Sequence, residues 1–175
     1  MVEGVMTEKE KAVFEVLIEG SMQAVWNEIT KTDELQGAIF NMRMHTDGLR
    51  PGGKIRMRTG NGKYTGVVGE VLEFDPPRRF VHTMRFTNFD DPPSTVIYEL
   101  EEEGNKVRFT LTVEDIPAGT KTAKQMKQGG TMIVNALKAI VETGRPPLGT
   151  RILYKVFKLM EPFSPKGTRS ENWPL

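Results

Sequence analysis

The hydrophobic and polar positions of the chain alternate with a period of two over much of its length. The clearest case is VRFTLTV, residues 107–113, where every odd-numbered position is apolar and every even-numbered position is polar. This period is typical of a strand with one buried and one wet face in an antiparallel sheet. Similar patterns, broken by turn sequences such as DG, NG and DPP, predict seven strands: 12–20, 40–46, 54–59, 64–74, 78–86, 95–103 and 107–113.

A period of three to four residues, which is typical of helices, occurs between these runs and after them. Ser21 can cap a helix over residues 22–30, whose apolar side chains form one stripe. The stretch KTDELQGAIF predicts a second short helix that starts near Thr32. The longest helical stretch runs from about Thr120 to Thr143 and is followed by a glycine, which commonly ends helices.

The predicted order is therefore one strand, two short helices, six strands and one long helix. A curved antiparallel sheet of seven strands needs a cover for its concave face. Only the last helix is long enough to provide it, because a helix rises about 1.5 Å per residue. The pattern predicts an α+β fold in which the sheet wraps around this helix.

Two adjacent glycines, Gly129 and Gly130, interrupt the long helix. Each glycine inside a helix costs roughly 1 kcal/mol relative to alanine, so their presence needs an explanation. We interpret them as leaving space for a ligand or opening the mouth of a cavity. The alternatives are that they let helix and sheet approach closely, or that they mark the true start of the helix.

Composition excludes several classes of function. The chain of 175 residues has 24 Lys and Arg against 23 Asp and Glu, so no overall basic charge indicates binding to nucleic acid. Cysteine is absent, which excludes disulfides, thiolate nucleophiles and cysteine-ligated metals. No apolar run is long enough for a membrane span, so we expect no integral membrane association. The N-terminal sequence lacks a secretory signal pattern, and we expect the protein to be cytoplasmic.

Four segments in order resemble a known superfamily: FEVLIEGSMQAVWNEIT, PGGKIRMRT, GEVLEFDPPRRFVHTMRF and NALKAIVETG. They are similar to segments of the START/Bet v 1-like (SRPBCC) superfamily, in the branch of homologues of heat-shock chaperone ATPase activators. The resemblance implies a helix-grip fold, in which a curved antiparallel sheet and a long C-terminal helix enclose a ligand cavity. The chain differs from the family pattern near LQGAIF and at Gly129-Gly130, where the family usually has bulky residues, often tryptophan.

We predict three parts in the chain: an N-terminal arm over residues 1–11, a helix-grip domain over 12–145 and a C-terminal extension over 146–175. Residues 145–175 hold six Lys or Arg against two Glu. A short basic amphipathic helix is predicted there, with one apolar face made of Leu148, Ile152, Val156 and Leu159. We expect this helix to dock on its own domain or on a second subunit, giving a possible homodimer. An acidic membrane or partner is the alternative. Trp173 is expected to fill a groove.

The alternation also predicts which side chains face the helix and line the cavity. The predicted ligand-binding residues are Met44, Met57, Phe80, His82, Met84, Tyr98, Phe109, Met126, Gly130, Ile133 and Leu137. His82 and Tyr98 are the candidates for polar contacts, unless a backbone carbonyl or each other already satisfies them. Glu70 and Glu73 lie on opposite faces of one predicted strand, so at most one of them points inward.

We find no sequence motif for a cofactor and no convincing set of metal ligands. The first hypothesis is therefore a protein that binds a small, largely apolar molecule, lipid-like or polyketide-like. The second is a cyclase, dehydratase or hydrolase with His82 as general base and with Tyr98 or a glutamate as second group. The third, implied by the resemblance alone, is an interaction partner of a chaperone. Whether the protein catalyses a reaction stays open at this point.

Overall fold

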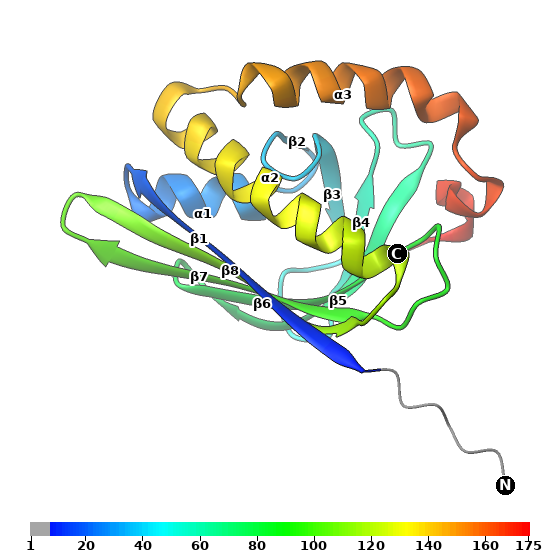
Figure 1. Ribbon diagram of the computed structural model, residues 1–175, viewed down its shortest axis with the longest axis horizontal. Coiled ribbons are helices and arrows are strands. Elements are labelled where there is room, and N and C mark those ends of the chain that lie inside the picture. The colour runs from blue at the N-terminus through cyan, green and yellow to red at the C-terminus, as the bar shows by residue number, and fades with distance from the viewer. Residues whose placement is uncertain (1–7) are drawn as a thin grey trace, which may run out of the picture.

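The computed structural model describes residues 8–175 and shows one antiparallel sheet that curves around a long helix (Figure 1). The sheet has eight strands in the order β1-β8-β7-β6-β5-β4-β3-β2. Their bounds are β1 (Lys9–Glu19), β2 (Leu35–Gln36), β3 (Met42–Thr46), β4 (Lys54–Arg58), β5 (Thr65–Asp75), β6 (Arg79–Phe86), β7 (Ser94–Glu103) and β8 (Lys106–Pro117). The helices are α1 (Met22–Thr30), α2 (Lys121–Thr143) and α3 (Leu148–Met160), followed by the single turns Glu161–Phe163, Lys166–Thr168 and Ser170–Asn172.

The predicted α+β helix-grip fold is confirmed, with one more strand than expected. Strand β1 begins at Lys9, which pairs with Pro117 of β8, so it starts before the predicted domain boundary at residue 12. Residues 1–7 of the predicted N-terminal arm lie outside the described residues. The division into arm, domain and extension remains a prediction.

The prediction of a second short helix near Thr32 was wrong, because this segment forms β2 and a series of turns. Phe40 and Asn41 have positive φ angles of 53° and 55°, which an α-helix does not allow. Gln36 of β2 is fully buried, and its side-chain amide donates a hydrogen bond of 2.8 Å to the carbonyl of Lys31. This bond ties β2 to the C-cap residue of α1, an arrangement that the helical pattern did not predict.

Helix α2 matches the prediction closely. The side chain of Thr120 accepts a hydrogen bond from the backbone N–H of Ala123 at 3.2 Å and caps the helix start. Gly144 ends the helix with a φ of 81°, a left-handed conformation that favours glycine. The helix crosses the concave face of the sheet, as predicted (Figure 1).

Aromatic rings fill the space between sheet and helices at the end near α1. Ring centroids lie 5.4 Å apart between Trp26 and Phe74 and again between Phe74 and Phe80. The series continues from Phe80 to Tyr98 at 5.8 Å and from Tyr98 to Phe109 at 5.6 Å. Each such pair adds about 0.5–1.5 kcal/mol beyond the burial of its apolar area. This end of the grip is therefore a packed core.

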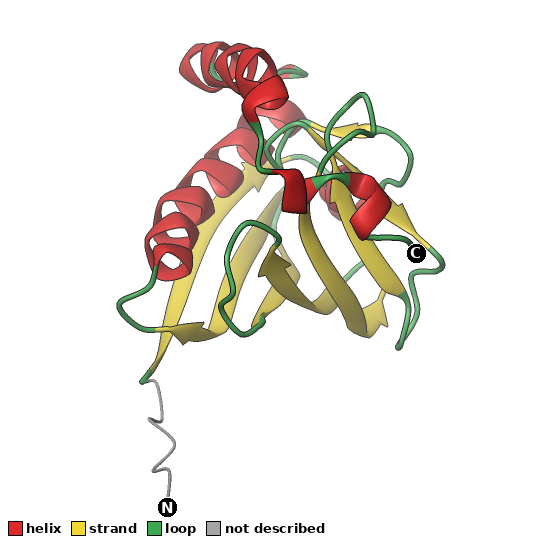
Figure 2. Cartoon of the chain, turned by 90° about the vertical axis from the view of Figure 1, so that its right-hand side faces the viewer, coloured by secondary structure: helices red, strands yellow, loops and turns green. Residues whose placement is uncertain are grey.

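The C-terminal extension lies on the side of α2 that faces away from the sheet. Helix α3 lies outermost, beyond α2, and the tail then returns along the hairpin of β4 and β5 (Figures 1 and 2). No residue of α3 is buried. Among residues 8–175, no helix combines the length and apolar character that crossing a membrane requires.

Candidate functional site

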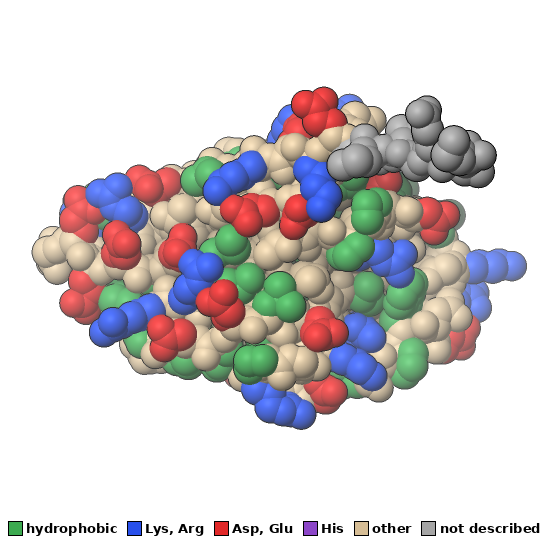
Figure 3. All heavy atoms as spheres, turned by 90° about the horizontal axis from the view of Figure 1, so that it is seen from below, with side chains coloured by type: hydrophobic (Ala, Val, Ile, Leu, Met, Phe, Trp, Pro, Cys, Tyr) green, Lys and Arg blue, Asp and Glu red, His purple; other side chains and the backbone are tan. Residues whose placement is uncertain are grey.

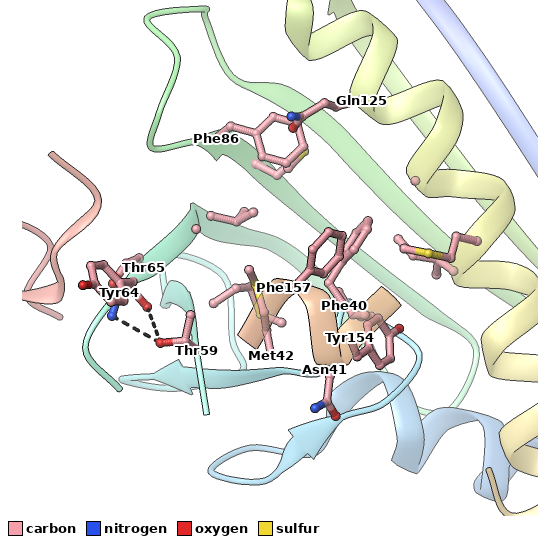
Figure 4. A pocket seen from close by; sticks show the side chains of 18 of the residues that line it. Phe40, Asn41, Met42, Thr59, Tyr64, Thr65, Phe86, Gln125, Tyr154 and Phe157 are labelled. Carbon is pink, nitrogen blue, oxygen red and sulfur yellow. Dashed lines mark hydrogen bonds between the residues drawn. The ribbon is translucent and has the colours of Figure 1, made fainter. Parts of the chain in front are cut away.

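A cavity of about 1180 Å³ lies between the concave face of the sheet, α2 and α3. The sheet contributes mainly apolar side chains from β3 to β8, among them Met44, Ile55 and Val113. The loop before β3 and the inner side of α3 close it from above with Phe40, Tyr154 and Phe157, which Figure 4 shows facing one another. The volume is slightly above the usual range of about 300–1,000 Å³ for small-molecule sites, which are also mostly apolar.

Two sets of polar side chains in this cavity belong to the sheet and its turns, while others, such as Asn41 and Gln125, lie on the loop before β3 and on α2 (Figure 4). His82 and Tyr98 lie deep in the sheet, next to the aromatic core, with ring centroids 5.6 Å apart. The rim is built by Thr59, Tyr64 and Thr65 around the turn between β4 and β5, with the hydroxyl of Thr59 bonded to the backbone of Tyr64 (Figure 4). A ligand in the cavity would thus meet one polar pair inside and a second polar zone at the edge.

The protonation of His82 follows from its hydrogen bond. Its Nδ1 lies 2.9 Å from the carbonyl oxygen of Thr83, and since a carbonyl only accepts, Nδ1 carries the proton. Nε2 is then left as an acceptor, and it has no hydrogen-bond partner among residues 8–175. Burial lowers the pKa of His82 to about 4, although the bond to Thr83 opposes this shift. The imidazole is therefore neutral at pH 7.

Tyr98 is also buried, and burial raises the pKa of its phenol well above the usual value. Its hydroxyl forms no hydrogen bond with any other side chain or backbone group of the described part of the chain. His82 and Tyr98 therefore do not satisfy one another, and the structure leaves one acceptor and one hydroxyl available inside a largely apolar cavity.

The structure brings eight of the eleven predicted ligand-binding residues to the cavity lining: Met44, Met57, His82, Met84, Tyr98, Met126, Gly130 and Ile133. The other three, Phe80, Phe109 and Leu137, are fully buried in the core and do not line the cavity. They are on the predicted face of their elements, but at the packed end of the grip, where the aromatic rings leave no space.

Our interpretation of the two helix glycines needs correction. A Cβ on Gly130 would lie 2.2 Å from the ring of Phe14, and one on Gly129 would lie 2.9 Å from the ring of Phe40. Both glycines border the cavity, but the volume that they free is taken by these two rings. Close packing is thus the physical reason for the pair, which lies well inside α2 rather than at its start.

Neither Glu70 nor Glu73 points into the cavity, since both are exposed. The register of β5 against β6 shifts between Val71 and Glu73, and this bulge turns both carboxylates outward. A glutamate is therefore not available as the second polar group next to His82. Within residues 8–175, no three histidine, aspartate or glutamate side chains are grouped so as to hold a metal ion.

Sequence reasoning missed the residues that close the cavity from above. Phe40 was assigned to the end of the predicted helix and Asn41 to the predicted strand over residues 40–46, whereas both form the loop that lines the cavity. Tyr154 and Phe157 were overlooked because the apolar face of α3 was expected to pack inward. Instead the opposite face does so, and the hydroxyl of Tyr154 donates a hydrogen bond of 2.7 Å to the carbonyl of Gly37.

The tail after α3 is attached to the outer side of β4 and β5. Ser170 N–H donates to the carbonyl of Lys63 at 2.9 Å, and Arg58 donates to the carbonyl of Trp173 at 2.8 Å. The guanidinium of Arg85 lies over the indole of Trp173, 5.2 Å from the ring centroid. The extension therefore docks on its own domain, as expected, but mainly through this tail.

A curved antiparallel sheet that encloses a long C-terminal helix, with a cavity between them, defines the helix-grip class of the START/Bet v 1-like superfamily. Within that class, the family model described as "Activator of Hsp90 ATPase homolog 1-like protein" matches residues 10–142. The chain belongs to this family, as the resemblance in its sequence predicted. No curated protein sequence matches the chain.

Solved structures with a similar fold include three with informative names. An Hsp90 activator from Plasmodium falciparum is 21% identical with a TM-score of 0.60, covering 78% of this chain and 97% of that one. CalU16 from Micromonospora echinospora is 20% identical with a TM-score of 0.57, covering 83% and 82%. The Aha1 dimer from Colwellia psychrerythraea is 16% identical with a TM-score of 0.63, covering 77% and 98%. At these identities the likeness shows the fold alone.

Proposed function

We propose that this protein binds a small, largely apolar molecule, lipid-like or polyketide-like, in the cavity between sheet, α2 and α3. The observation that carries the proposal is a cavity of about 1180 Å³ lined by His82 and Tyr98, whose Nε2 and hydroxyl have no hydrogen-bond partner among residues 8–175 and are not buried in protein. A few polar groups in a mostly apolar pocket are what orients a small ligand, so a free acceptor on His82 and a free hydroxyl on Tyr98 in the cavity lining favour a ligand that bonds to them.

Binding is better supported than catalysis. A general base works best when its pKa lies near the working pH, whereas burial holds the pKa of His82 at about 4. Both glutamates that could have assisted it are exposed. His82 is thus suited to accept a hydrogen bond from a ligand hydroxyl, with Tyr98 as a second contact.

The test uses two fluorescent probes of nearly the same shape, 9-anthracenemethanol and 9-methylanthracene, of which only the first carries a hydroxyl. We expect both to bind, and the alcohol to bind about fivefold more tightly, because one hydrogen bond contributes about 1 kcal/mol. Tyr98→Phe and His82→Leu should each reduce this preference, measured as the ratio of the two Kd values.

Tyr154→Phe is the matched control. Tyr154 also lines the cavity, but its hydroxyl is already bonded to the carbonyl of Gly37. This variant should keep the preference for the alcohol. If neither probe binds, the cavity is not a ligand site. If both Tyr98→Phe and His82→Leu keep the preference for the alcohol, the assigned contacts are wrong.

A further inference from the structure

Helix α3 and the turn after it carry an apolar stripe that faces solvent. Its members follow one another at intervals of three or four residues, so that they share one face of the helix. The stripe consists of Leu148, Ile152, Val156, Leu159 and Phe163, with the side chains of Leu159 and Phe163 exposed to 74% and 79%. None of the five is buried by any part of the chain that the structure describes. Large contiguous apolar patches on a surface mark sites of interaction.

The charges of α3 are all positive. Arg151, Lys155 and Lys158 lie on this helix, which contains no acidic residue, and none of the three forms an ion pair with another described residue. At 100° per residue, they lie to one side of the stripe. They also border the cavity, so the stripe and the cavity mouth share the same basic edge.

These charges decide between two occupants of the stripe. If α3 packed antiparallel against α3 of a second copy, the cations of both helices would lie along the same side of the contact, with no acid on either helix to offset them. An anionic lipid surface complements them, because its phosphates attract the cations while the acyl region accepts the apolar side chains. The family match ends at residue 142, before α3 begins. The solved structure described as a dimer covers 77% of this chain. These two comparisons therefore do not assign α3 to a dimer contact.

The shape of the molecule is also suited to a flat surface. Helix α3 lies along one side as the outermost layer, so a plane can touch its whole length (Figures 1 and 2). By contrast, the outer face of the sheet shows apolar side chains scattered among charges of both signs (Figure 3). With 13 residues, α3 is about 20 Å long, too short to span a bilayer but long enough to lie in its interface.

We propose that α3 docks parallel to the plane of an anionic lipid bilayer. The stripe enters the boundary of the acyl region, while Arg151, Lys155 and Lys158 contact lipid phosphates, which their long side chains can reach from the edge of the helix. In this orientation the cavity lies behind α3, and the basic residues lie between the bilayer and the cavity edge that they border. The proposal goes beyond the proposed ligand binding and does not depend on it.

The experiment is flotation of the full chain with vesicles of phosphatidylcholine alone or with 30% phosphatidylserine, at low and at high salt. We expect at least tenfold more binding to the anionic vesicles at low salt. The double variant Leu159→Glu/Phe163→Glu should lose at least tenfold of this binding. Val13→Glu/Leu17→Glu, which changes two exposed apolar residues on the sheet, is the control and should bind like the unchanged protein.

Three results would overturn the proposal. Failure of the unchanged protein to bind either type of vesicle removes its basis. If the double variant Leu159→Glu/Phe163→Glu still binds the anionic vesicles, the binding depends on charge alone and not on the apolar stripe. A dimer of the unchanged protein in sedimentation that becomes a monomer in this variant would assign the stripe to a second copy. Both double variants alter only exposed positions, and circular dichroism verifies that each is folded.

Discussion

Helices α2 and α3 are both amphipathic, yet they use their apolar faces in opposite ways. The apolar face of α2 is buried against the sheet, with Leu137 fully excluded from solvent. The apolar face of α3 points outward, and α3 is held instead by the hydrogen bond of Tyr154 and by the tail. Periodicity thus shows which side chains share a face, but the direction of that face depends on whether the rest of the chain offers an apolar surface for it.

The difference also separates two parts of the molecule. The family match over residues 10–142 contains the sheet and α2 almost entirely, which together form a complete core. Helix α3 comes after it and adds no buried residue. The grip is therefore expected to determine stability, whereas the extension is expected to determine access to the cavity and contacts with other molecules.

The sharpest test of this comparison is to make the same change on both helices. Leu137→Ala should lower the free energy of unfolding by about 2–5 kcal/mol, because it leaves a cavity in the core. Leu159→Ala on the exposed stripe should change it by less than about 0.5 kcal/mol. Urea denaturation measures the free energy of unfolding of both variants. Because both change leucine to alanine on a helix, the change in helix propensity cancels when the two losses are compared.

A loss above about 1.5 kcal/mol in Leu159→Ala would contradict the comparison. If that loss also grew with protein concentration, the stripe would be packed against a second copy rather than facing solvent.

The two histidines provide a second test, through pH. The pKa of His82 is about 4 when folded and is near 6.5 when unfolded, so between these values the unfolded state binds more protons. Stability should therefore fall as pH decreases from about 6.5 towards 4, by about 2 kcal/mol between pH 7.5 and pH 5. His82→Gln should remove most of this slope in urea denaturation at a series of pH values.

His45→Gln is the control for that series. His45 lies on β3 with Nδ1 2.9 Å from Arg58, near the tail, and partial burial and this cation lower its pKa while Asp33 opposes the shift. Because His45 is less buried, it should account for a smaller part of the slope. A larger effect of His45→Gln than of His82→Gln would place the acid-sensitive group on β3 next to the tail instead of inside the cavity.

The smallest expected effects come from a pair of glycines. Gly130→Ala places a methyl group on the ring of Phe14 and should destabilise the fold by about 1–2 kcal/mol despite the better helix propensity of alanine. Gly149→Ala on α3 meets open space and should stabilise by up to about 1 kcal/mol. Opposite signs of the two changes in thermal unfolding support the comparison, and equal signs contradict it.

The sequence allowed the grip to be predicted because its signals are local. Alternation along 107–113 and the caps at Ser21 and Thr120 depend on neighbouring residues alone, and the structure has each element at its expected place. The turn around Phe40 and Asn41 was not predicted, because KTDELQGAIF has a helical pattern, whereas the burial of Gln36 in this segment is a tertiary effect. Asn41 is a residue type enriched at positive φ angles, but Phe40 is not, so the residue types gave little sign of two such angles in a row.

For the candidate site, the sequence predicted which side chains point towards the helix better than it predicted where the cavity lies. Phe80 and Phe109 have the expected orientation, but whether a position borders core or cavity depends on rings contributed by Trp26 and Phe74 from other elements. The same holds for Gly130, whose freed volume is filled by Phe14. Such complementarity between distant segments is not encoded in any single stretch of the chain.

The attachment of the tail has a consequence for how the cavity can open. Helix α3 is joined to α2 at one end through Pro146 and Pro147, and at the other it is held by the contacts of Ser170 and Trp173 with the β4–β5 hairpin. A helix linked at both ends has a high effective concentration next to its docking site, so displacement and return are steps within one molecule. The rate at which the cavity exchanges its contents is then independent of protein concentration, and it depends on the inner contacts of α3, such as that of Tyr154.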